Sequence, residues 1–103
     1  MRWTLKEWAS ESFKAEKNDG SEVYVYRAPL WNDFFKRGGA PGYEVHYHGS
    51  PIARIYFDRK GATVKALEAG KCWPEISDLD LIEIALRLGN ARRLRPGAAA
   101  SLN

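Results

Sequence analysis

The chain has 103 residues, of which 45% are hydrophobic and 13% aromatic. This length suits one small domain, and the composition is too apolar and too aromatic for a disordered chain. The sequence has no apolar run near the roughly 18 residues of a membrane-spanning helix, and charges near its N-terminus interrupt the stretch that a signal peptide needs. A single cysteine, Cys72, cannot form an internal disulfide, so we expect a globular protein of a reducing compartment, the cytoplasm.

The formal net charge is only +3, but the charge is unevenly distributed along the chain. Residues 59–74 and 91–103 are basic, whereas residues 75–90, which lie between them, are acidic. Such segregation produces strong local fields while the total charge stays small. A nucleic-acid-binding domain is usually more basic over a whole face, so the charge does not favour nucleic acid as the main partner.

The N-terminal segment is predicted to be a helix. Thr4 and Glu7 have the spacing of a capping box, and apolar residues recur behind them at intervals of three to four residues. These apolar residues are Leu5, Trp8, Ala9 and Phe13. Residues 18–20, Asn-Asp-Gly, end the predicted helix because Asn and Gly accept the left-handed conformation found after a helix terminus.

The middle of the chain alternates as β-strands do. In residues 22–28, Val23 and Val25 face one way and Tyr24 and Tyr26 the other. Three further strands are predicted at residues 43–48, 52–57 and 62–67, joined by a Gly49-Ser50 turn and a hairpin connection at residues 58–61. These short links predict an antiparallel meander. Residues 30–42 are the least regular stretch, a short helical turn followed by a Gly/Pro loop.

A second helix follows near the C-terminus. Ser77 is a good N-cap, and Asp78 and Asp80 lie in the first turn, where the helix dipole favours negative charge. Apolar residues then cover most of the circumference up to Gly89, which indicates burial against a sheet.

The predicted fold class is therefore α+β, a single antiparallel sheet of about four strands with an N-terminal and a C-terminal helix packed on one face, in the order α-β-β-β-β-α. We expect residues 1–95 to form one domain and residues 96–103 to be a disordered tail.

Two histidines are the first candidates for chemistry. His46 and His48 would share one strand face with Glu44, a spacing that lets two imidazoles reach one metal ion, with Cys72 or Asp58 as further ligands. The alternative is a pair of histidines on the solvent face of a half-buried sheet, which we favour because no second ligand pair has a recognisable spacing. We predict no catalytic residue, no metal and no cofactor, with a small nuclease or metal-dependent enzyme as the remaining alternative. Cys72, beside Lys71, is interpreted as a structural or surface thiol.

Aromatic and basic residues on the irregular stretch are the first predicted partner-binding patch. Large aromatics next to arginine are typical of protein-binding hot spots, although the same mixture can stack bases or simply cap the open end of a sheet. The patch consists of Trp31, Phe34, Phe35, Lys36 and Arg37.

Two charged groups provide further candidates. Asp78, Asp80 and Glu83 would either cap the C-terminal helix or mimic phosphate against a basic groove of a partner. A basic group would contact nucleic acid in the alternative function, or be a solvated turn and helix end. It consists of Arg59, Lys60, Lys71, Arg92, Arg93 and Arg95.

One stretch of the chain resembles a known group of proteins. Residues 47–52, Tyr-His-Gly-Ser-Pro-Ile, are followed by a turn with Asp58 and Gly61, a third strand, and Gly70 before the closing helix. This pattern, over residues 43–88, is similar to small phage and prophage proteins with a Tyr-His-Gly-(Ser/Thr)-x-Ile hairpin. Residues 71–75 depart from the group, which usually has a Gly-Trp pair and a threonine-rich cap there.

The resemblance implies a viral or mobile-element context, and many small proteins from that context bind and inhibit host machinery. Our predicted function is therefore a phage-type interaction protein that inhibits a host nucleoprotein complex, such as a CRISPR effector, in the host cytoplasm. The alternative is a nucleic-acid-binding accessory protein. No membrane partner is expected, and the oligomeric state, including a dimer, is left open.

Overall fold

The computed structural model describes residues 2–27, 42–58 and 61–94. Within these residues the chain forms one six-stranded antiparallel sheet, whose strands lie side by side in the order in which they occur in the sequence. The strands are β1 (Trp3–Ala9), β2 (Ser12–Lys17), β3 (Glu22–Arg27), β4 (Gly42–Tyr47), β5 (Ser50–Asp58) and β6 (Gly61–Ala66). A short 3₁₀ helix, η1 (Glu68–Cys72), and the long helix α2 (Asp78–Leu94) follow.

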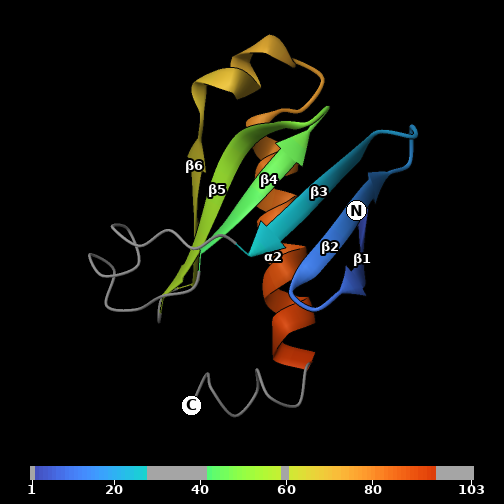
Figure 1. Cartoon of the computed structure of the whole chain (residues 1–103), viewed down its shortest axis with the longest axis vertical. Helices are drawn as coiled ribbons and strands as arrows, with labels where there is room; N and C mark the ends of the chain where they lie inside the picture. Colours follow the sequence, from blue (N-terminus) through green and yellow to red (C-terminus); the bar gives the residue numbers. More distant parts are fainter. Residues whose placement is uncertain (1, 28–41, 59–60, 95–103) are drawn as a thin grey trace.

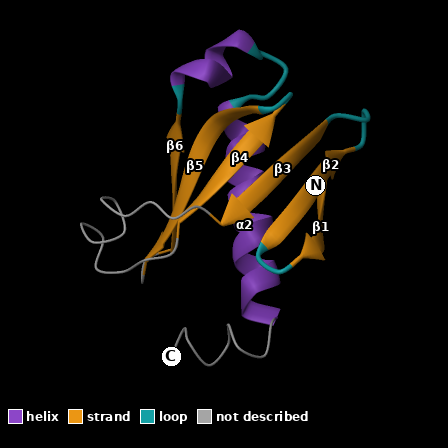
Figure 2. Ribbon diagram, viewed as in Figure 1, coloured by secondary structure: helices purple, strands orange, loops and turns teal. Residues whose placement is uncertain are grey.

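The sheet and α2 form two layers (Figure 1; Figure 2). Helix α2 crosses one face of the sheet, and no other helix of the described segments lies on either face. The core fills the space between the layers, where alternate side chains of each strand meet α2. Its most deeply buried side chains include Trp3, Phe13, Val23, Val25, Tyr43, Val45, Ile55, Ile84 and Leu88.

The predicted N-terminal helix is wrong, because this segment is the β1–β2 hairpin. Ala9 pairs with Ser12, and Glu11 takes a positive φ of 59° in the two-residue turn. A register shift between Glu7 and Ala9 displaces the alternation of β1 by one residue. The residues that suggested one helical face are spread over the hairpin: Leu5 packs against the core, Trp8 is exposed on the other side of β1, and Phe13 belongs to β2. Their helical spacing therefore does not reflect a shared face. The sheet consequently has six strands instead of about four.

The other elements agree with the predicted α+β class, with small shifts. The strand predicted at residues 22–28 is β3, and the hairpin connection at residues 58–61 joins β5 to β6. The turn between β4 and β5 is His48-Gly49 and not Gly49-Ser50, since both residues have positive φ values, 50° and 80°. This pair of left-handed residues is the signature of a tight hairpin turn.

Candidate functional site

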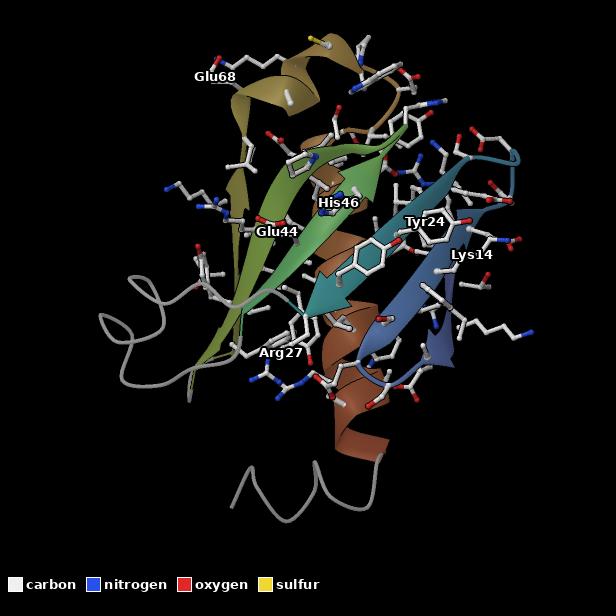
Figure 3. All side chains as sticks on the ribbon, in the orientation of Figure 1. Lys14, Tyr24, Arg27, Glu44, His46 and Glu68 are labelled. Carbon is white, nitrogen blue, oxygen red and sulfur yellow. The ribbon has the colours of Figure 1, made fainter. Side chains whose placement is uncertain are left out.

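The sheet face opposite α2 carries a group of aromatic side chains, which we call the aromatic face: Trp8, Tyr24, Tyr26 and His46. Tyr24 and Tyr26 stack with their ring centroids 6.3 Å apart, and Tyr26 meets the His46 ring edge-on at 5.2 Å. The indole of Trp8 in β1 also contacts Tyr26 edge-on, at 6.3 Å. Figure 3 shows Tyr24 and His46 on the near side of the sheet, with α2 behind it.

Strand alternation places these rings on the surface. Val23 and Val25 point into the core, so the intervening tyrosines of β3 must point to the other face. Tyr24 lies opposite His46 in the register of β3 and β4, which brings the aromatic residues of two strands together. Trp8 is 55% exposed and Tyr24 36%, although aromatic side chains of this size usually find cover in a folded domain.

The charged groups of this face largely pair with each other. The Lys14 ammonium lies 3.1 Å from Glu16 and 3.4 Å from Glu22, and the Glu16 carboxylate in particular raises the pKa of Lys14. The Glu44 carboxylate lies 3.2 Å from His46 Nε2 and 3.4 Å from Arg54 Nε. A nucleic-acid backbone would meet carboxylates as well as ammonium groups here, whereas a protein partner tolerates such a mixed rim.

The predicted acidic patch is not a separate surface, because two of its members hold β1 to α2. Asp80 is 1% exposed, and its carboxylate accepts hydrogen bonds from the Trp3 indole at 3.0 Å and from Arg2 at 2.6 Å. It also accepts the Ser77 backbone N–H at 2.8 Å, which confirms Ser77 as the start of the helix. Glu83 accepts the backbone N–H of Trp3 at 2.8 Å.

This network keeps Asp80 ionised. Burial alone would raise the pKa of Asp80, but the hydrogen bonds from the Trp3 indole and from Ser77 outweigh it and hold the pKa below its usual value. The carboxylate is therefore occupied within the fold and cannot imitate phosphate towards a partner. Asp78 is the exposed member of the predicted patch.

The predicted basic group is also not assembled by the part of the chain that the structure describes. Arg92 is only 8% exposed, with its guanidinium over the rings of Phe57 at 4.8 Å and Tyr43 at 5.7 Å. This packing over two rings gives Arg92 a structural role. Lys71 is exposed and pairs with Glu68 at 3.1 Å. Arg59, Lys60, Arg95 and the side chain of Arg93 lie outside the described structure.

The two histidines do not share a site. His46 lies on the aromatic face, whereas His48 occupies the β4–β5 turn and stacks on Trp73, with centroids 4.6 Å apart. The expected shared strand face is therefore wrong, because the strand ends at Tyr47. Over residues 2–27, 42–58 and 61–94, no three His, Cys, Asp or Glu side chains gather in a way that could hold a metal ion. Cys72 is exposed at the end of η1.

The predicted aromatic loop patch lies outside the described residues, so its role stays a prediction. It comprises Trp31, Phe34, Phe35, Lys36 and Arg37. The sequence pattern placed Tyr24 and Tyr26 together on one side of their strand, but it did not predict the aromatic face to which they belong. Two facts could not be read from the sequence. Strand β3 pairs with β4, which brings His46 beside the tyrosines, and the N-terminal segment is a strand, which brings Trp8 to the same surface.

Comparison with known proteins gives no further constraint: no family model, curated protein or solved structure matches the chain. The resemblance to phage and prophage proteins stays a prediction. In the described structure, no helix has both the length and the apolar character needed to span a bilayer.

Proposed function

We propose that the protein is an interaction module whose protein partner docks on the aromatic face of the sheet. The observation that carries this proposal is an exposed cluster of Trp8 and Tyr24, backed by Tyr26 and His46, among charges that pair with each other. Tyrosine and tryptophan dominate protein-binding hot spots because they bury a large rigid surface at a small cost in conformational entropy.

The ion pairs of Glu44 hold polar groups of the aromatic face in fixed positions. The carboxylate contacts both His46 and Arg54, so polar groups beside the rings are held in place before a partner arrives. Preorganised polar groups reduce the entropy lost on binding, and they fix the orientation of the docked partner.

For the partner itself, we propose a host nucleoprotein complex of the CRISPR-effector kind, which the protein would inhibit by occupying a surface. This identity rests on the resemblance of residues 43–88 to phage and prophage proteins. It does not require any acidic phosphate mimic, since the structure uses Asp80 internally.

A second candidate function is binding of single-stranded nucleic acid on the same face. The stacked pair Tyr24 and Tyr26 has the arrangement on which bases stack in sheet-based RNA-binding domains. The nearby carboxylates oppose this function, and it predicts a steep loss of affinity with salt.

The test is a pull-down from bacterial lysate with the tagged chain, with and without nuclease. The variant Trp8→Ala/Tyr24→Ala removes the exposed rings, and Lys71→Ala is a matched control on η1, away from this face. We expect the wild type and the control to retain the same host complex after nuclease treatment, and the double variant to lose it. The retained complex is then assayed for inhibition of its nuclease activity by the added chain.

Two results would contradict the proposal. If the double variant retains the complex as well as the wild type does, the aromatic face is not the binding surface. If retention disappears with nuclease and direct binding to single strands falls steeply with salt, the function is the nucleic-acid-binding alternative.

A further inference from the structure

Helix α2 is apolar on its outer side as well as on the side that faces the sheet. Leu79, Ile82 and Leu86 are 72%, 46% and 60% exposed, whereas Ile84 and Leu88 on the inner side are fully buried. A surface helix normally presents polar residues to water, and a helix that is apolar all round is normally buried all round. The outer side of α2 therefore has the composition of a covered surface.

A groove of about 770 Å³ runs beside this outer side, between α2 and β6. Ala62 and Ala66 of β6 pair with Phe57 and Ala53, whose side chains point into the core. Both alanines are nevertheless exposed, and they line the groove together with residues of α2. At the end of the groove, Gly89 lets the helix approach Phe57: a Cβ there would lie 3.3 Å from the phenylalanine ring. Small residues such as Ala62, Ala66 and Gly89 therefore line the groove, beside the large exposed side chains on the outer side of α2.

We propose that a second copy of this chain covers this surface, with the two α2 helices packed antiparallel about a two-fold axis. Leu79, Ile82 and Leu86 follow one another at intervals of three and four residues, the spacing of a seam between two helices. If the two-fold axis passes midway between Ile82 and Leu86, Ile82 of each copy contacts Leu86 of the other copy. The same register brings Leu79 of each copy to the level of the C-terminal half of the partner's helix, beyond Leu86.

The charge distribution of the helix selects the antiparallel direction. The exposed carboxylates Glu75 and Asp78 lie at its N-terminal end, whereas the last turn carries arginine at position 93, next to the buried Arg92. Antiparallel packing brings the acidic end of one helix towards the basic end of the other, and it also opposes the helix dipoles favourably. Parallel packing would bring like charges together.

The first test measures the mass of the full chain by sedimentation equilibrium up to about 0.5 mM. Stable interfaces bury about 800 Å² per partner, and this seam rests on three large apolar side chains of one helix, so we expect a dimer of the 11.7 kDa chain that dissociates on dilution. Leu86→Glu should weaken the dimer by at least about a hundredfold, because a carboxylate would be buried in the seam without a partner. Tyr24→Glu, on the opposite face, is the control that should dimerise normally.

The second test measures the direction of packing by disulfide cross-linking in a Cys72→Ser background, which removes the native exposed thiol. Chains with Ile82→Cys and chains with Leu86→Cys are mixed and oxidised. Antiparallel packing predicts that the mixed pair cross-links at least about tenfold faster than either chain with itself. Circular dichroism confirms that each variant is folded.

The proposal is overturned if the wild type is a monomer throughout this concentration range, or if Leu86→Glu, once shown to be folded, dimerises as the wild type does. It is also overturned if the wild type is monomeric and Leu86→Glu abolishes capture of a lysate protein, because the occupant is then a different protein. Preferential cross-linking of like chains would overturn the antiparallel arrangement.

Discussion

Asp80 shows how one side chain can join two ends of a chain. Its carboxylate accepts hydrogen bonds from the indole of Trp3, 77 residues away, and from the first turn of its own helix at Ser77. The Trp3 ring is fully buried, so its N–H needs an acceptor inside the protein, and Asp80 is that acceptor. β1 therefore stays on the edge of the sheet through this carboxylate as well as through its pairing with β2.

We expect Asp80→Asn to lower the free energy of unfolding by about 2–4 kcal/mol, because the amide cannot accept all of these bonds and leaves Arg2 without its partner. Urea denaturation measures the change. Asp78→Asn is the matched control in the same helical turn, and it should cost less than about 1 kcal/mol since Asp78 is exposed. Equal effects of the two substitutions would contradict the role of Asp80.

The lowered pKa of Asp80 also predicts how stability depends on pH. A carboxyl group with a lower pKa in the folded than in the unfolded chain stabilises the fold above its unfolded pKa of about 4, and this stabilisation is lost as the pH falls through the folded pKa. Between about pH 5 and pH 2, the wild type should therefore lose more stability than Asp80→Asn does. The free energy of unfolding of both proteins is measured as a function of pH. If Asp80 had an ordinary pKa, the two curves would have the same slope in this range.

At the scale of elements, the sequence predicted those features that are set by residues close together in the chain, such as a helix start or a hairpin turn. Ser77 and Asp80 sit three residues apart at the start of α2, and Asp58 and Gly61 close the β5–β6 hairpin, so both features could be predicted from a few neighbouring residues. The β1–β2 hairpin could not, because the insertion near Trp8 hides its alternation and only pairing with β3 distinguishes it from a helix. The aromatic face depends on that pairing too.

The short helix η1 depends on close contact with β5. The Leu67 N–H donates to the Ile52 carbonyl at 2.9 Å, and a Cβ at Gly70 would lie 3.0 Å from that same oxygen. We expect Gly70→Ala to lower the free energy of unfolding by about 1–3 kcal/mol, because η1 must shift away from backbone that cannot yield. Lys71→Ala, at an exposed position beside it, should change stability by less than about 0.5 kcal/mol. Unchanged thermal unfolding of Gly70→Ala would show that η1 moves freely.

At the scale of the whole molecule, the two proposed surfaces lie on opposite sides. The aromatic face covers the side of the sheet that α2 leaves open, where Figure 3 shows Tyr24 and His46 in front of the sheet and α2 behind it. The proposed seam with the second copy lies on the outer side of α2. With the sheet and one helix layer between them, occupying one surface does not cover the other. Two copies joined through α2 would therefore present their aromatic faces outwards, in opposite directions.

This arrangement predicts a complex with two copies of the chain and two copies of the partner. Because both aromatic faces of the dimer are accessible, the wild type should bridge partners fixed to a surface and dissociate from them at least about tenfold more slowly than Leu86→Glu does. In solution, Leu86→Glu should still bind, but with one partner per chain in a complex of half the mass, which sedimentation measures. If Leu86→Glu loses the partner altogether while remaining folded, the partner contacts α2 itself, and the division of roles between the two faces is wrong.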